Sequence, residues 1–254
     1  MRPIGLWMAF LALVIAACAA ALAAPPAATK PLTIVIVGDS TVANYPENLP
    51  DRGWGQFIDD FFDPGVTVVN LAKNGRSSKT FIKEGLWTKA LAEKPNYILI
   101  QFGHNDSHAA TQPESTNAAT DYRDYLRQYV DDARHIGAVP ILITPMQRRT
   151  YDASGKLDNS LLPYADAMKA VAREKGVDLI DLNAMSGDLY QRLGKDANKI
   201  VSRNGLDTTH FNAKGARWMA DLVIGQLLKD QPELKARLKK GAEIPKAEQV
   251  GADK

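Results

Sequence analysis

The chain contains a single cysteine in 254 residues, Cys18, and this cysteine lies near the N-terminus. The rest of the chain therefore cannot form an internal disulfide, so the folded domain must be stabilised by core packing. The chain also has little excess of either charge, because 31 basic and 29 acidic residues leave a formal net charge of only +2. This balance gives no reason to expect nucleic-acid binding or strong electrostatic attraction of acidic substrates.

Residues 1–24 have the pattern of an export signal. Arg2 provides a short positive start, residues 4–17 are apolar, and residues 21–23 form a small-residue cleavage signal. The apolar stretch is short and alanine-rich for a membrane span. We therefore expect export to the periplasm or the medium. A lipoprotein cleavage box before Cys18 fits the same segment, and in that case the mature protein would be anchored to a membrane.

The remaining sequence alternates between strand and helix patterns. Segments in which apolar residues recur at helical spacing lie at 54–62 and 122–130, and a last one lies at 219–227. This β-α-β alternation predicts an α/β fold with a mainly parallel sheet and helices on both faces. Five apolar runs predict the buried strands of that sheet, at residues 33–37, 66–71, 97–102, 139–143 and 177–182.

Individual residues mark where helices begin and end. Gly137 and Gly176 stand where two long helices should stop, and Asn212 is a plausible cap for the last helix. With 45% hydrophobic residues, the chain suits one globular domain, which we place at residues 31–230. Residues 231–254 are charged and show little periodicity, so we expect a loose C-terminal tail.

A serine follows the first predicted strand, in the sequence Gly38-Asp39-Ser40-Thr41. Ser40 would then stand at the carboxyl edge of the sheet, where α/β folds place their sites. A serine hydroxyl is a poor nucleophile unless a base removes its proton, and His210 is the best candidate for that base. Asp207 precedes it by three residues and can hold the imidazole Nδ1, leaving Nε2 for Ser40. The alternative is that Asp207 only shapes a turn before the last helix.

An acyl-transfer site also needs donors for an oxyanion, and three groups follow the first three strands. They are the backbone N–H groups of Ser40 and Gly75 and the side-chain amide of Asn105. Glycine permits a close approach of the backbone to a ligand, although Asn74-Gly75 is also an ordinary turn dipeptide. All three groups would meet at one edge of the sheet, which a turn role alone does not predict.

Four sequence blocks resemble those of the SGNH (GDSL) hydrolases, and the match is closest to the rhamnogalacturonan acetylesterase branch. The blocks are Gly38–Thr41, Asn70–Ser78, Gln101–Asp106 and Asp207–His210, in the order of that family. The resemblance covers about residues 31–230. It implies a three-layer, flavodoxin-like fold with a five-stranded parallel sheet, a serine esterase activity and Ser40, Asp207 and His210 as the triad. Thr41 replaces a leucine of many lipase-like members, which argues against a lipase.

Three neighbours of the site residues have supporting roles in this interpretation. We expect Asp39 to fix the nucleophile turn, and His104, after Gly103, to brace the loop behind Asn105. His104 and Asp106 could also be taken for metal ligands. However, no second histidine or cysteine lies at ligand spacing, so we expect neither a metal nor another cofactor.

Substrate-binding candidates lie mainly in the long connection at residues 145–163. It carries Arg148, Arg149 and Tyr151 on the predicted edge of the site, and Arg76 is a weaker candidate near the second strand. Arginines and an aromatic ring would suit an acidic, hydroxyl-rich polysaccharide, whereas a solvated loop is the plainer interpretation.

The sequence thus predicts an exported, monomeric carbohydrate esterase. Its expected partner is an acetylated polysaccharide or oligosaccharide, first of all pectic rhamnogalacturonan, and this substrate follows from the resemblance alone. One alternative is a lipase or thioesterase with the same site. Another is a non-catalytic glycan-binding module, although a binding module has no need of the complete set of catalytic residues.

Overall fold

A computed structural model describes residues 30–244 and 246–252. The predicted export signal at 1–24, with Cys18, lies outside these described residues. One five-stranded parallel sheet organises the fold, in the strand order β2-β1-β3-β4-β5. The strands are β1 (Leu32–Gly38), β2 (Val66–Asn70), β3 (Tyr97–Gln101), β4 (Val139–Ile143) and β5 (Asp178–Ile180). The five predicted strands are confirmed.

The sheet is buried on both faces. Successive side chains of a strand point to opposite faces, and in β1 Ile34 and Ile36 belong to one apolar cluster while Val35 and Val37 belong to another. Both faces must therefore be covered by helices, as in other parallel sheets. This explains why the strands appear in the sequence as continuous apolar runs and not as alternating ones.

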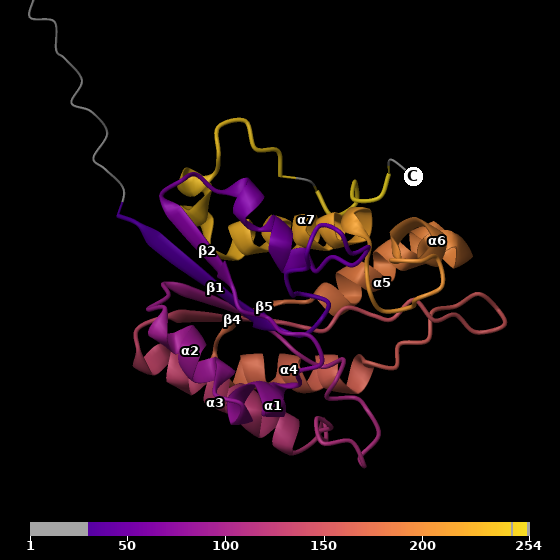
Figure 1. The fold of residues 1–254 in the computed structure, drawn as a ribbon, viewed down its shortest axis with the longest axis horizontal. Coiled ribbons are helices and arrows are strands. Elements are labelled where there is room, and N and C mark those ends of the chain that lie inside the picture. The colour runs from indigo at the N-terminus through magenta and orange to yellow at the C-terminus, as the bar shows by residue number, and fades with distance from the viewer. Residues whose placement is uncertain (1–29, 245, 253–254) are drawn as a thin grey trace, which may run out of the picture.

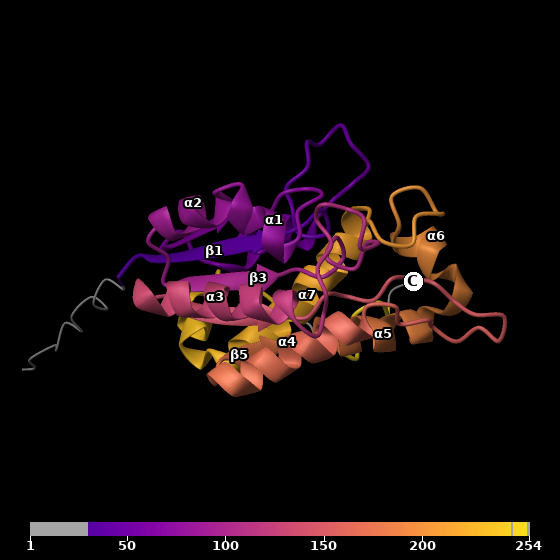
Figure 2. The ribbon, with the colours of Figure 1, turned by 90° about the horizontal axis from the view of Figure 1, so that it is seen from below.

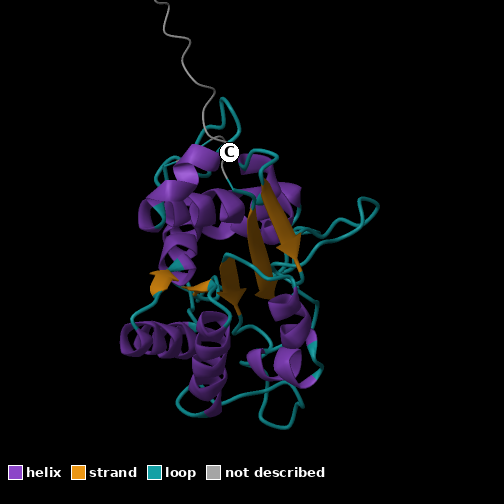
Figure 3. Ribbon diagram, turned by 90° about the vertical axis from the view of Figure 1, so that its left-hand side faces the viewer, coloured by secondary structure: helices purple, strands orange, loops and turns teal. Residues whose placement is uncertain are grey.

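Two groups of helices provide this cover and produce three layers (Figures 1 and 3). One face packs against α1 (Ser78–Lys83), α2 (Leu86–Ala92), α3 (Asp121–His135) and α4 (Leu162–Lys175). The other face packs against α5 (Leu182–Leu193) and α7 (Ala213–Asp230), with α6 (Ala197–Val201) against α7. The predicted three-layer α/β fold is confirmed. None of the described helices is long and apolar enough to cross a membrane.

The predicted helix ends are where the residue types place them. Gly137 follows α3 with φ +81°, and Gly176 ends α4 with φ +56°, a backbone conformation that favours glycine. The side chain of Asn212 accepts a hydrogen bond from the N–H of Gly215 at 2.9 Å and caps α7. Asp181 caps α5 in the same way and ends β5 early, so that strand is shorter than predicted.

The helical segment predicted at 54–62 is two short 3₁₀ helices, η1 (Trp54–Phe57) and η2 (Asp59–Phe61). Its apolar residues are buried as the pattern requires, including Trp54 and Ile58. So short a segment has few α-type hydrogen bonds to offset the entropy of nucleation, and the tighter turn suffices to bury its side chains.

The C-terminal segment corrects the prediction of a loose tail. A 3₁₀ helix, η4 (Pro232–Arg237), follows α7, and Leu234 and Arg237 are buried. Val250 is also buried, and its carbonyl oxygen accepts a hydrogen bond from Arg192 of α5 at 3.1 Å. Single apolar residues spaced along a charged segment produce no detectable periodicity, yet each fills a gap in the core.

Candidate active site

The loops after β1, β2 and β3 meet at one end of the sheet and form an open cleft of about 450 Å³. The nine residues that line it are Ser40, Tyr45, Leu49, Asp51, Asn74, Gly75, Asn105, Arg203 and His210. The structure therefore brings the predicted nucleophile, base and oxyanion groups into one cavity. This follows from the parallel sheet, because the carboxyl ends of its strands lie at the same edge.

Ser40, His210 and Asp207 form a continuous hydrogen-bonded row. Ser40 Oγ lies 2.9 Å from His210 Nε2, and His210 Nδ1 lies 3.0 Å from Asp207 Oδ2. The second oxygen of Asp207 accepts the backbone N–H groups of Thr209 and His210, both at 2.7 Å. Burial would raise the pKa of Asp207, but the hydrogen bonds from His210 and Thr209 outweigh it and lower the pKa to about 2. The carboxylate is thus ionised at neutral pH and fixed in the orientation that the imidazole requires.

The nucleophile turn is held from beneath by Asp39, which is fully buried. Its Oδ1 accepts the backbone N–H and the hydroxyl of Thr41, at 2.9 and 2.8 Å. Its Oδ2 lies 3.3 Å from Nδ1 of the buried His104. Burial would raise the pKa of Asp39, but His104 and Thr41 outweigh it and lower that pKa. His104 therefore links the turn of Ser40 to the loop that carries Asn105.

The three residues that carry the predicted oxyanion donors all line the cleft. Among the described residues, neither the N–H of Ser40 nor that of Gly75 has an intramolecular acceptor. Gly75 has φ +76° in the turn after Asn74. The Asn105 amide donates one hydrogen bond to the carbonyl oxygen of Arg76 at 3.0 Å, which holds the amide beside Gly75. These donors are already in place before a substrate oxygen arrives, as oxyanion stabilisation requires.

The loop after β3 depends on Gly103 and Asp106. Gly103 has φ +144°, and a Cβ there would lie 2.5 Å from the ring of Pro145, so only glycine fits. Asp106 is buried and accepts the N–H and the hydroxyl of Ser78, the first residue of α1, with Thr116 Oγ1 at 3.0 Å. Burial raises the pKa of Asp106 to about 6 despite these hydrogen bonds. Asp106 thus fastens the Asn105 loop to the segment after Gly75, a role that the sequence did not indicate.

The structure corrects the prediction that Arg149 binds substrate, because its side chain is only 1% exposed. The guanidinium donates to the carbonyl oxygens of Asp207 at 3.0 Å and His210 at 2.8 Å, with Thr209 at 3.4 Å. It also lies 4.7 Å from the ring centre of Phe211. Arg149 therefore supports the loop of Asp207 and His210 from inside the protein.

The other three substrate-binding candidates also lie outside the residues that line the cleft. Arg148 donates to the carbonyl oxygen of His104 at 3.1 Å, behind the Asn105 loop. The hydroxyl of Tyr151 donates to the carbonyl oxygen of Tyr190 at 3.0 Å. The Arg76 side chain pairs with Glu84 at 2.9 Å and donates to the carbonyl oxygen of Asn74 at 3.0 Å, so it supports the turn before Gly75. The sequence placed these residues at the correct edge of the sheet but could not determine the direction of their side chains.

One wall of the cleft is a loop that the sequence analysis missed, residues 44–52, which projects beyond β1 (Figure 2). Arg52 shapes this loop, because its guanidinium donates to four of the loop's carbonyl oxygens. Tyr45 joins it to the nucleophile turn through a 2.8 Å hydrogen bond to the carbonyl oxygen of Ser40. The length of the connection between the first strand and Trp54 was the one sequence signal for such a wall.

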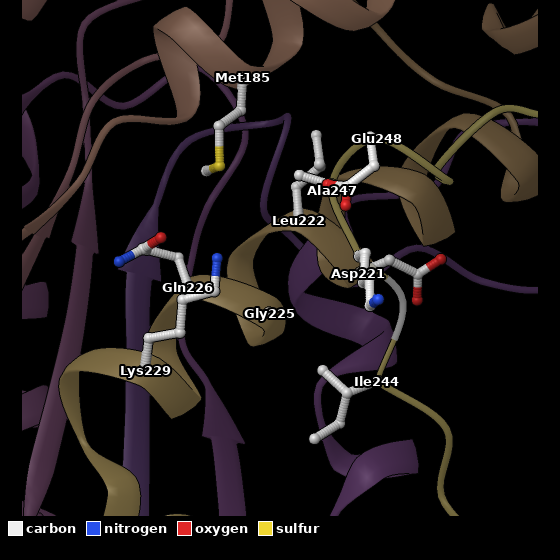
Figure 4. A pocket seen from close by; sticks show the side chains of 10 residues that line it. Met185, Asp221, Leu222, Gly225, Gln226, Lys229, Ile244, Ala247 and Glu248 are labelled. Atoms are coloured by element: carbon white, nitrogen blue, oxygen red, sulfur yellow. The ribbon is translucent and has the colours of Figure 1, made fainter.

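A second cavity, of about 330 Å³, lies between α7 and the C-terminal segment (Figure 4). Met185, Leu222 and Ile244 give it apolar walls, and Gln226 and Lys229 stand at its side. No serine, histidine or cysteine lies among its lining residues. It therefore lacks the nucleophile and the base of acyl transfer, and the cleft at Ser40 is the candidate active site.

A serine, histidine and aspartate row beside preformed oxyanion donors, on a flavodoxin-like sheet, defines a serine ester hydrolase. The sequence also matches the model of the GDSL-like Lipase/Acylhydrolase family over residues 34–223. The chain belongs to this family. Within the described residues, no group of three histidine, cysteine or acidic side chains could hold a metal ion.

Curated relatives and solved structures agree with this assignment. The chain is 39% identical to rhamnogalacturonan acetylesterase RhgT of Bacillus subtilis, over 76% of this chain and 88% of the relative. It is also 39% identical to the probable rhamnogalacturonan acetylesterase YesY of the same organism, over 75% and 89%. The crystal structure of Bacillus subtilis YxiM superposes with a TM-score of 0.69 at 28% identity, over 80% of this chain and 57% of that one.

Proposed function

We propose that this protein removes acetyl groups from plant cell-wall polysaccharide, with rhamnogalacturonan as the first substrate. The observation that carries the reaction is the row of contacts from Ser40 to His210 and from His210 to Asp207, at 2.9 and 3.0 Å. The substrate class is supported by the two rhamnogalacturonan acetylesterase relatives at 39% identity.

In the first half of the reaction, Ser40 Oγ attacks the acetyl carbonyl carbon while His210 Nε2 takes the hydroxyl proton. The carbonyl oxygen becomes an oxyanion and accepts hydrogen bonds from the N–H groups of Ser40 and Gly75 and from the Asn105 amide. The bond between the carbonyl carbon and the sugar oxygen then breaks. His210 gives its proton to that oxygen, and the acetyl group stays on Ser40.

In the second half, His210 takes a proton from water as the water oxygen adds to the acetyl carbon. The same oxyanion donors act again. The bond to Ser40 Oγ breaks, His210 returns the proton to Ser40, and acetate leaves. One water molecule is consumed for each acetyl group released.

The cleft suits a short acyl group on a polar alcohol. Leu49 is the single aliphatic side chain among its lining residues, and charged or amide groups such as Asp51 and Asn74 stand around it. A long acyl chain would need buried apolar space for each methylene. The open, polar cleft therefore supports a carbohydrate ester over a lipid ester.

The export signal predicted from residues 1–24 supports a further part of the proposal, namely that the protein acts outside the cytoplasm. Mass spectrometry of the protein purified from its native cells would distinguish cleavage after residue 24 from lipidation at Cys18.

Acetate release from acetylated rhamnogalacturonan, compared with acetylated xylan and with p-nitrophenyl esters of two to eight carbons, tests the function. We expect release from the pectic polymer, good cleavage of p-nitrophenyl acetate and poor cleavage beyond about four carbons. Ser40→Ala and His210→Ala should each abolish the activity, and the double variant should be no worse than either, because members of one catalytic unit are not additive.

Three results would contradict the proposal. Rates that rise toward the octanoate ester would favour the lipase or thioesterase alternative. Binding of the polysaccharide without acetate release would favour a glycan-binding module. Additive losses in the double variant would show that Ser40 and His210 do not act together.

A further inference from the structure

Arg203 occupies a position that the mechanism above does not use. Its guanidinium lines the cleft between two carboxylates, with Nε 2.9 Å from Asp207 Oδ2 and Nη1 3.1 Å from Asp51 Oδ1. Asp207 Oδ2 is also the oxygen that lies 3.0 Å from His210 Nδ1. Arg203 and the catalytic histidine therefore share one carboxylate oxygen, and Asp51 lies on the far side of the guanidinium.

This arrangement has an electrostatic consequence during catalysis. When His210 takes the proton of Ser40, it becomes a cation that must be stabilised by Asp207. The guanidinium of Arg203 is a fixed positive charge at the same Asp207 oxygen, so it repels the positive charge that develops on the His210 imidazole. Asp51 opposes Arg203 in turn, because it neutralises part of the guanidinium charge. Arg203 and Asp51 therefore act in opposite directions on the ion pair that Asp207 forms with the protonated imidazole.

Three other ionisable side chains lie near His210, and none of them forms an ion pair with Asp207. Asp39 lies beneath the nucleophile turn and is paired with His104. Arg149 contacts the backbone carbonyl of His210 at 2.8 Å, on the protein side of the loop. Tyr45, on the cleft wall, is neutral because burial raises its pKa. Arg203 and Asp51 are thus the charged pair that acts on Asp207 from the cleft.

We infer that Arg203 is a positioning residue that fixes Asp207 against His210 and disfavours the protonated imidazole, with Asp51 as the counter-charge that limits this effect. The inference rests on the proposed esterase mechanism. It assigns to the wall loop a second function besides shaping the cleft, because Asp51 belongs to that loop. The wall and the triad are then coupled through one guanidinium.

The test is the pH dependence of kcat/KM for p-nitrophenyl acetate. In Arg203→Met the opposing cation is lost, so the acid limb should move to higher pH, by about 0.5 unit for a charge in a partly exposed site. In Asp51→Asn the guanidinium is no longer neutralised, so the acid limb should move to lower pH. Arg203→Met should also lower kcat by about tenfold with KM little changed, since Asp207 loses one of its supports. Arg203→Lys keeps the charge and should restore the acid limb.

Arg217 provides a matched control. Its guanidinium also lies between two carboxylates, 2.9 Å from Asp60 and 3.1 Å from Asp221, and its side chain is 41% exposed against 39% for Arg203. It lies on α7 outside the residues that line the cleft. Arg217→Met should therefore leave the pH profile where it is.

The outcomes separate the inference from the proposed function. If the unaltered protein hydrolyses no ester, the proposed function fails. If it hydrolyses the ester and the Arg203 and Asp51 variants shift the acid limb in the same direction, or not at all, the inference is wrong. Should Arg203→Met fail to fold, Arg203→Gln takes its place. Because Asp51 lines the same cleft as His210, its own charge also acts on the imidazole. Asp51→Asn in the Arg203→Gln background therefore separates the two effects, and a shift as large as in the single variant would contradict the inference.

Discussion

Replacement of Arg149 by methionine tests whether the catalytic loop is held from inside the protein. Methionine keeps the apolar stem of the side chain beside Phe211 but removes the charge and all the donors. The loop then loses the hydrogen bonds to the carbonyl oxygens of Asp207 at 3.0 Å and His210 at 2.8 Å. Asn198 Oδ1 also loses its donor at 2.9 Å, while Asn198 Nδ2 keeps its hydrogen bond to the backbone carbonyl of residue 149.

The size of the effect follows from these contacts. A hydrogen bond to a charged group is worth about 1.5 to 3 kcal/mol, so the two strong bonds to the loop predict a loss of about 3 to 6 kcal/mol. In a domain of this size, each kcal/mol lowers the Tm by roughly 2 to 4 °C. We expect Arg149→Met to lower the Tm by about 6 °C or more. Because the same bonds place His210 opposite Ser40, kcat should fall by about 10²-fold.

The assays are thermal unfolding by circular dichroism and steady-state hydrolysis of p-nitrophenyl acetate below the unfolding transition. Arg134→Met serves as the control, because Arg134 also donates to two backbone carbonyl oxygens, those of Lys175 and Gly176 at 2.8 Å, but at an exposed position away from the residues that line the cleft. A Tm within about 2 °C of the unaltered protein, with kcat unchanged, would refute the reasoning. Arg149 would then be a substitutable core residue and not a support of the triad.

Three more predictions concern single residues of the site. Asn105→Ala should lower kcat by roughly 10²- to 10³-fold with KM little altered, because its amide meets charge that develops only in the transition state; a raised KM with kcat intact would make it a ground-state binding residue. Gly103→Ala should lower the free energy of unfolding by about 1 to 3 kcal/mol, measured in urea, since the new Cβ meets Pro145 at 2.5 Å and φ is +144°; an unchanged midpoint would show that the loop relaxes freely. The pKa of Asp207 is lowered to about 2 in the folded state, so its contribution to stability is present above about pH 4 and is lost as the pH falls toward 2. Asp207→Asn should therefore flatten the dependence of stability on pH in this window, and an equal slope in both proteins would exclude this carboxylate as its source.

The layers of the fold and the core of the site could be predicted from the sequence. Short apolar runs that alternate with segments of helical spacing are typical of strands in a parallel sheet that is covered on both faces. Once that sheet is granted, topology brings the ends of its strands to one edge. Ser40, Gly75 and Asn105 follow three of these strands directly, so their meeting in one cleft needed no knowledge of side-chain packing.

The directions of the long polar side chains could not be predicted in this way. Arg148 and Arg149 are adjacent and chemically identical, yet the first supports the Asn105 loop and the second supports the triad loop. Their acceptors are backbone carbonyl oxygens of segments distant in the sequence, and no local sequence pattern predicts such a contact. The same holds for Leu234, whose burial depends on a gap beside α7 and not on its charged neighbours in the sequence.

The sequence by itself determined which backbone segments reach the catalytic edge, because strand formation and parallel pairing depend on local patterns of apolar residues. The tertiary structure alone decided which charges face the cleft. Arg203 and Asp51 are 152 residues apart and meet only when the wall loop and the triad loop fold against each other. A charged side chain takes its role from the partners that packing brings within about 3 to 4 Å, and such partners are set by the whole fold.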